Sequence, residues 1–258
     1  MVGQLELVAQ VSSYTPNTFP HSILLLGERG CGKHTLVDDL CKMYELELID
    51  ITESICLDTV VKASVNLVPT LYLIDLDKIT EKQQNVILKF LEEPADNAYI
   101  VLISTVRSLI LDTVYNRCLV FEFKPYSSEE LLQFVPKDMN ASMLLKYCHT
   151  PGQIKEVKPD ELDKIVNTCD KIAEVIGKAN YSNLFNLVDS IKSYNVYLFY
   201  NVLLDTIYNK YLNSNNIKMI KLYNIVEDSL HKLMDSRYDV ECLLISLVTE
   251  LWEASRAN

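Results

Sequence analysis

Short apolar runs alternate with longer, helically patterned segments along the first half of the chain. The runs predict buried strands, and the segments between them predict helices. The expected strands are residues 23–26, 46–50, 70–75, 99–105 and 118–123. Because strands separated by helices pair in parallel, the pattern predicts a three-layer α/β domain with a five-stranded parallel sheet.

The helices of this half each have an expected buried face. A helix over residues 3–13 precedes the first strand. The helix that follows the first strand is expected to bury Leu36, Val37, Leu40 and Met43, and the next to bury Val60, Val61 and Val65.

A long helix is expected from Thr80 to Glu93. Thr80 is a suitable N-cap, and Pro94 ends the helix. Its expected buried residues are Val86, Ile87, Phe90 and Leu91.

The pattern changes after Lys124-Pro125, where no further strand is expected. Short helices are predicted over residues 128–135, 141–148 and 152–157, and helical periodicity runs from about residue 160 to the end. Pro159 marks a boundary because proline disfavours helix in the residue before it. The tyrosine and leucine stripes at 194–212 and 238–252 predict the core of a helical bundle.

Composition narrows the class of protein. The 258 residues are 49% hydrophobic with a net charge of −11, and no basic patch stands out. This charge repels phosphate backbones, so nucleic-acid binding by the chain alone is not expected. The seven cysteines form no C-x-x-C pair, which favours reduced thiols in the cytoplasm over a zinc module. No apolar run is long enough to predict a membrane span.

A phosphate-binding loop, "GERGCGK", lies between the first strand and the helix after it. Its candidate nucleotide-binding residues are Gly27, Gly30, Gly32 and Lys33. Backbone N–H groups of such a loop hold an anion, while the lysine reaches the outer phosphates.

The loop lacks the hydroxyl that would bind Mg²⁺. His34 stands where Ser or Thr is expected, and imidazole offers no oxygen ligand. Thr35 lies about 100° further round the helix and is a poor replacement. Both residues remain candidates for the nucleotide site.

Four segments carry a family resemblance. They are "PHSILLLGERGCGKHTL", "LYLIDLDKITEKQQNVILKFLEEP", "VLISTVRSLILDTVYNRC" and "TPGQIKEV", and their order and spacing resemble the AAA+ clamp-loader family. Within it the chain resembles the delta-prime type of the bacterial DNA polymerase III complex, a relative of the gamma/tau ATPase. The likeness extends to about residue 157. Beyond that it is looser, and best at "SRYDVECLLISLVTELW".

The resemblance gives the predicted regions their names. Residues 1–124 would form a P-loop AAA+ domain, 125–158 a short helical lid, and 159–258 an all-α collar for oligomerisation.

The family places adjacent acids at the end of the third strand, one for Mg²⁺ and one for the attacking water. Their positions correspond to Ile74 and Asp75, so the metal-side acid is missing. Asp77 could replace it, or a one-residue slip could make Asp75 the metal ligand. Thr105 corresponds to a polar residue near the γ-phosphate, or is simply a strand-end hydroxyl.

Of two arginine positions in the family, this chain lacks an arginine at one and has it at the other. Gly152 stands where the lid arginine would sense the γ-phosphate, and Lys155 is expected to be a surface charge. "YNRC" resembles the family's S-R-C motif, so Arg117 would reach into a neighbour's ATP site as an arginine finger. A local salt bridge or cap is the alternative. Glu92 and Glu93 are expected to be surface charges, not catalytic acids.

These features predict a delta-prime-like stator of a replication clamp loader. It would be a non-catalytic subunit of a DNA polymerase III-type holoenzyme, without efficient ATP hydrolysis, that lends Arg117 to a neighbouring ATPase. The alternatives are a gamma/tau-like ATPase with an altered metal site and a non-replicative AAA+ adaptor.

The resemblance also implies cofactors and partners. ATP and ADP are the candidate cofactors of the degenerate loop; the sequence leaves open whether nucleotide or Mg²⁺ binds, and no zinc or other metal site is expected. The implied partners are gamma/tau-like and delta-like subunits, the sliding clamp, and primer-template DNA through the complex. A cytoplasmic protein without membrane contact is expected.

Overall fold

The computed structural model describes residues 3–15, 18–175, 188, 190–214, 216–233 and 238–256. The chain divides into two compact units. The sheet unit comprises Met1–Gln133 with Thr150–Gln153, and the helical unit comprises Phe134–His149 with Ile154–Asn258. The division into three regions at residues 124 and 158 stays a prediction.

The predicted five-stranded parallel sheet is confirmed. Its strands are β1 (Ser22–Leu26), β2 (Glu47–Asp50), β3 (Thr70–Asp75), β4 (Ala98–Ser104) and β5 (Leu119–Glu122). They pair in the order β2-β3-β4-β1-β5. In the parallel registers, Leu24 lies opposite Leu102, and Ile74 lies opposite the same residue on the other side of β4. The carboxyl ends of β3, β4 and β1 therefore meet side by side at one edge.

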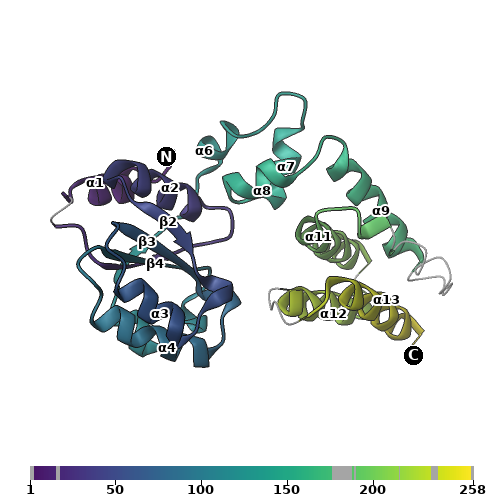
Figure 1. Ribbon diagram of the computed structural model, residues 1–258. Helices are drawn as coiled ribbons and strands as arrows, with labels where there is room; N and C mark the ends of the chain where they lie inside the picture. Colours follow the sequence, from purple (N-terminus) through teal and green to yellow (C-terminus); the bar gives the residue numbers. More distant parts are fainter. Residues whose placement is uncertain are drawn as a thin grey trace. The chain divides into compact units, whose positions relative to one another are not determined.

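Helices cover both faces of this sheet, as three layers require (Figure 1). They are α1 (Leu5–Ser12), α2 (Lys33–Tyr44), α3 (Leu57–Ser64), α4 (Glu81–Glu92) and α5 (Asp112–Tyr115). A further short helix, α6 (Ser128–Leu132), follows β5 and lies apart from the sheet. Short 3₁₀ turns span Thr52–Ser54, Leu76–Lys78 and Arg107–Leu109.

Successive side chains of a strand point to opposite faces of the sheet, and each face has its own core. Ile23 and Leu25 join one core with residues of α1 and α2. Leu24 points the other way and joins a second core with residues of α3, α4 and α5. Because successive strand residues face opposite sides, apolar runs without polar interruptions are required in a sheet covered on both faces.

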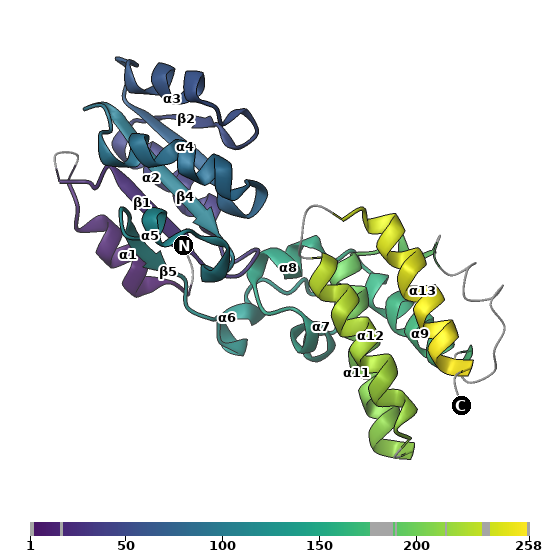
Figure 2. The same cartoon turned by 90° about the horizontal axis from the view of Figure 1, so that it is seen from below.

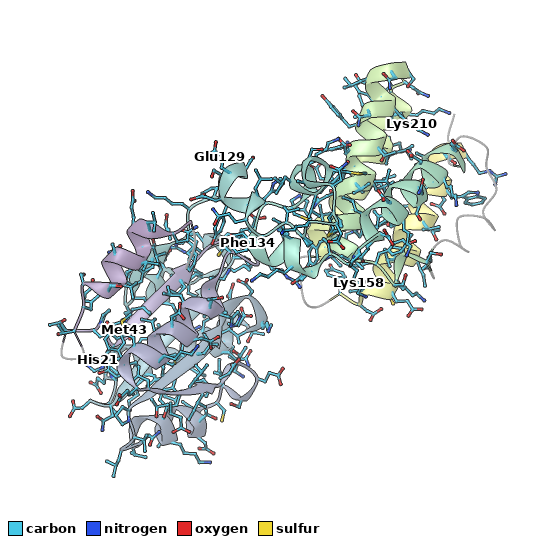
Figure 3. All side chains as sticks on the ribbon, turned by 90° about the horizontal axis from the view of Figure 1, so that it is seen from above. His21, Met43, Glu129, Phe134, Lys158 and Lys210 are labelled. Carbon is cyan, nitrogen blue, oxygen red and sulfur yellow. The ribbon has the colours of Figure 1, made fainter. Side chains whose placement is uncertain are left out.

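Three residues predicted to be buried are exposed, and for them the sequence prediction is wrong. Met43, at the end of α2, is 52% exposed (Figure 3). Val61 and Val65 are 61% and 70% exposed, because α3 turns Val60 and Ala63 toward the sheet instead. A short helix with apolar residues on both sides does not reveal from its sequence which side packs.

The predicted N-cap of α4 is confirmed. The Thr80 hydroxyl accepts a hydrogen bond from the Gln83 N–H, and the Gln83 side chain accepts one from the Thr80 N–H. This reciprocal pair satisfies two donors that a helix start leaves unpaired. Ile87, Phe90 and Leu91 are buried as predicted.

The helical unit contains α7 (Ala141–Tyr147), the second half of α8 (Pro151–Glu156), α9 (Glu161–Val175), α11 (Val196–Ser214), α12 (Lys218–Leu233) and α13 (Val240–Arg256). Helix α11 packs against α7, α9 and α12, and α12 packs against α13 (Figure 2). The predicted helical character after residue 160 is confirmed within the described ranges. Residues 176–187, 189, 215, 234–237, 257 and 258, which that prediction includes, lie outside them.

The predicted stripe along α11 is only partly buried. Phe199 and Tyr200 are fully enclosed, and the Tyr200 hydroxyl meets Ser229 Oγ at 2.7 Å. Tyr208 and Leu212, further along the same helix, are 50% and 57% exposed. The bundle core therefore ends before the carboxyl end of α11. Lys210, labelled in Figure 3, lies in this last part of the helix.

Candidate functional site

The phosphate loop joins β1 to α2, as predicted. Gly30 and Gly32 have φ angles of 80° and 108°, which L side chains rarely adopt. Among the described residues, the N–H groups of Gly30 and Gly32 have no acceptor in hydrogen-bond range. They are the groups that could hold an anion at the start of α2.

Every carbonyl of the loop from Gly27 to Gly32 accepts a hydrogen bond from the protein itself. Lys33 Nζ donates to Gly27 O and to Glu28 O, the latter at 3.1 Å. Arg29 O accepts from Thr150 Oγ1 at 2.8 Å, and Gly30 O accepts from the Gly152 N–H at 2.9 Å. Cys31 O accepts from the Tyr126 hydroxyl at 2.8 Å, and Gly32 O accepts from the Leu36 N–H at 3.0 Å. The loop is thus held in shape without a nucleotide.

Lys33 is folded back on its own loop. The residue is 8% exposed, and its ammonium group is bonded to two loop carbonyls. Contact with an outer phosphate would require these bonds to be exchanged for bonds to the phosphate. The lysine is therefore part of the loop's internal hydrogen bonding in this structure.

The segment Thr150–Gln153 packs directly on the loop. A Cβ at Gly152 would lie 2.5 Å from Gly30 Cα, so the two backbones meet without room for a side chain. Gln153 Nε2 adds a hydrogen bond to Glu28 Oε1 at 3.0 Å. Gly152 stands at the position that resembles the lid-arginine site, and there its backbone contacts the loop. An arginine side chain at this position would push the two backbones apart.

His34 and Thr35 both lie on the exposed side of α2. The core face of the same helix is formed by Leu36, Val37 and Leu40. Neither His34 nor Thr35 has a side-chain hydrogen bond within the described ranges. Within those ranges, neither side chain is therefore hydrogen-bonded to an acid at the end of β3.

Those acids are already engaged. Asp75 accepts a hydrogen bond from the Asp77 N–H at 3.1 Å and pairs with Lys78 at 3.3 Å. Asp77 Oδ1 accepts from Ser104 Oγ at 2.6 Å, and both Asp77 oxygens accept from the Thr105 N–H. Two donors at the end of β4 thus engage both oxygens of Asp77, and a metal ion would compete with them.

Ile74, at the position of the metal-side acid, is fully buried in the core beneath the sheet. Asp75 is the last residue of β3, and its side chain is 16% exposed. Within the described ranges, no three His, Cys, Asp or Glu side chains converge as a metal site would require.

The sequence interpretation missed Ser104, which precedes the predicted candidate Thr105. Strand β4 ends at Ser104, a fully buried hydroxyl that also reaches Val106 O at 3.1 Å. Thr105 contributes its backbone N–H rather than its hydroxyl to Asp77. A serine at the end of an otherwise apolar strand was the available signal.

Arg117 lies beyond α5 and does not contact the phosphate loop. Its Nη1 donates to Thr113 O at 2.7 Å, and its Nη2 forms an ion pair with Glu92. The arginine side chain is 35% exposed. Glu92 is a surface charge as predicted, 47% exposed, and its ion pair is the local salt bridge that the sequence offered as the alternative role of Arg117.

Comparison with known proteins agrees with this fold. The family model described as "DNA polymerase III, delta subunit" matches residues 57–127. A Thermotoga maritima structure of a DNA polymerase III gamma subunit-related protein is 17% identical, with a TM-score of 0.53 and coverage of 98% of this chain and 100% of that chain. A point mutant of RuvB from the same organism is 15% identical, with a TM-score of 0.50 and coverage of 65% and 64%.

Two curated relatives belong to replication systems. The replication factor C small subunit of Methanothermobacter thermautotrophicus is 20% identical over 222 residues, covering 80% of this chain and 69% of that protein. The DNA polymerase III subunit gamma of Buchnera aphidicola from Acyrthosiphon pisum is 26% identical over 170 residues, covering 52% of this chain and 47% of its own length. The chain thus spans about half the length of the gamma relative.

The parallel sheet with a phosphate loop after β1, followed by a helical region, is a fold that the chain shares with the gamma subunit-related structure. Together with the matches to polymerase III and replication factor C subunits, it supports a likeness to the AAA+ clamp-loader family. Within the described ranges, no helix combines the length and apolar character that crossing a membrane requires.

Proposed function

We propose that this chain is a delta-prime-like subunit of a replication clamp loader that does not hydrolyse ATP efficiently. In this proposal it works in the cytoplasm as a fixed member of the loader. It assembles with gamma/tau-like and delta-like subunits, acts on a sliding clamp, and meets primer-template DNA through the complex. Arg117 is its contribution to ATP hydrolysis, delivered to the site of a neighbouring subunit.

The observation that carries the proposal is the engagement of the chain's own catalytic positions. Lys33 is bonded to loop carbonyls, and the Asp77 carboxylate is bonded to Ser104 and Thr105. Gly152 is pressed against Gly30 where an arginine would be needed. Phosphoryl transfer depends on positioned charge around the γ-phosphate, and these contacts oppose it.

Arg117 is also held by protein contacts, but it differs from Lys33 in its exposure. Its guanidinium is partly exposed and is held by contacts from two elements, so it can meet an acceptor on another molecule. A fixed guanidinium that stabilises transferring phosphate charge contributes a large rate factor in arginine-finger systems. This contrast supports a role in trans over a role in the chain's own site.

The test replaces Arg117 in the clamp loader reconstituted with the partner subunits of the same organism. Arg117→Ala should reduce hydrolysis at the neighbouring site on the order of a hundredfold or more, as for other arginine fingers. Arg117→Lys should also lose most of it, because an ammonium group lacks the planar fork. Lys82→Ala, which removes an exposed cation from α4, is the matched control and should have no effect.

Unchanged hydrolysis with Arg117→Ala would contradict the role in trans. The ATPase alternative makes a different prediction for the isolated chain. Hydrolysis by the chain alone, abolished by Lys33→Ala, would favour a gamma/tau-like enzyme instead.

A further inference from the structure

The guanidinium of Arg117 is attached at two points. Nη1 donates to Thr113 O of α5 at 2.7 Å, and Nη2 pairs with Glu92 Oε1 at the end of α4. A guanidinium has five N–H donors in a planar fork. Two anchored nitrogens therefore fix its plane and still leave donors for an acceptor outside the molecule.

The two anchors belong to elements of the sheet unit that are hydrogen-bonded to each other. Gln84 of α4 is 1% exposed; its Nε2 donates to Leu109 O at 2.7 Å, and its Oε1 accepts from the Leu111 N–H at 3.0 Å. Arg107 lies 4.0 Å from the centre of the Tyr115 ring. The backbone before Arg117 is thus fastened to the helix that ends in Glu92.

The pair lies where another molecule can reach it. The Arg117 and Glu92 side chains are 35% and 47% exposed. Glu93, the next residue, is also exposed, but its carboxylate has no hydrogen-bond or ionic partner within the described ranges. Adjacent residues on a helix point in different directions, so only Glu92 is directed at the arginine.

From this geometry we infer that Glu92 is a positioning residue that holds Arg117 ready for a neighbouring subunit's phosphate. The inference rests on the proposed function of Arg117. A free arginine side chain loses rotamer freedom when it binds, whereas one held in advance has already lost much of it. Glu92 does not touch the nucleotide; it acts only through the arginine.

The decisive variant is Glu92→Gln, which keeps the size and removes the charge. In the reconstituted loader it should lower kcat at the neighbouring site about two- to fivefold, the size expected of an exposed charge pair. KM for ATP should be unchanged. Glu93→Gln is the matched control and should leave both constants at their wild-type values.

A double-mutant cycle separates positioning from a general structural effect. If Glu92 acts through Arg117, Glu92→Gln should have no further effect when Arg117→Ala is already present. Equal losses with and without the arginine, an unchanged kcat for Glu92→Gln, or a raised kcat would each overturn the inference. If Arg117→Ala itself leaves hydrolysis unchanged, the proposed function fails instead.

A measurement on the isolated chain tests the same contact without any partner. Rotation about the Cζ–Nη bonds of Arg117, followed by side-chain NMR, should be slow in the wild type and in Glu93→Gln. It should become fast in Glu92→Gln, because one anchored nitrogen is released. Equal rotation rates in all three proteins would overturn the inference even if the arginine finger is confirmed.

Discussion

Two glycines far apart in the sequence form the contact between the phosphate loop and the segment that packs on it. Gly30 and Gly152 meet backbone to backbone, and the Gly152 N–H donates to Gly30 O at 2.9 Å. Any side chain at Gly152 would collide with backbone atoms, which cannot move as a flexible side chain can. Glycine at position 152 therefore has two consequences: it allows this close packing, and it leaves the chain without an arginine at that position.

Gly152→Ala should destabilise the sheet unit by about 1–3 kcal/mol, the usual cost of forcing extra atoms into a packed contact. The new Cβ would lie 2.5 Å from Gly30 Cα. Urea denaturation followed by circular dichroism measures the change. Lys155→Ala, on the same helix, should change stability by no more than about 0.5 kcal/mol. A Gly152→Ala protein as stable as this control would show that the backbones are not in close contact.

Helix α4 runs from the acids that follow β3 to the partner of Arg117. It starts at the Thr80 cap, just after Asp77, and it ends at Glu92, the partner of Arg117. The buried Gln84 fastens the segment before α5 to it. Its position therefore affects the acids at the strand ends and the arginine at the surface alike.

Thr80→Ala should cost about 1 kcal/mol of stability, because the Gln83 N–H loses its side-chain acceptor. Thermal or urea denaturation measures it. Thr80→Ser retains the hydroxyl and is the control, with an expected change within about 0.5 kcal/mol. Equal stability of the alanine and serine variants would mean that the cap does not contribute.

At the scale of the whole molecule, the cysteines differ in reactivity across both units. Cys56 is exposed, and its hydrogen bond with Thr59 lowers the pKa of its thiol. Burial raises the pKa of Cys118 to about 12 and that of Cys148 to about 11. Only the thiolate is nucleophilic. A lowered pKa therefore increases the fraction of thiolate, and with it the reactivity, near neutral pH.

Cys56 should therefore react first with a thiol reagent between about pH 7 and 8, and Cys118 and Cys148 only after unfolding. Their thiolates become populated in the folded protein only as the pH approaches their raised pKa values. Spectrophotometric thiol titration of the native chain checks the order. Cys56→Ser should remove the fast phase, and its persistence in that variant would show that another thiol is responsible.

The fold of the sheet unit was predictable because its signals are local. Each buried strand is a short apolar run, and the phosphate loop and the Thr80 cap are set by residues close together in the sequence. The exposed faces of α2 and α3 were not predictable to the same degree. Which side of an apolar helix packs depends on the surface it meets, and that surface is formed by distant residues.

The sequence by itself determined the strands, the loop, the missing magnesium hydroxyl at His34 and the apolar residue Ile74 among the expected acids. Only the tertiary structure decided what the remaining polar groups do. It bonded Asp77 to Ser104 and paired Glu92 with Arg117. Such partners are separated by many residues, and hydrogen bonds and ion pairs require atoms within a few ångströms. Only the folded chain brings them that close.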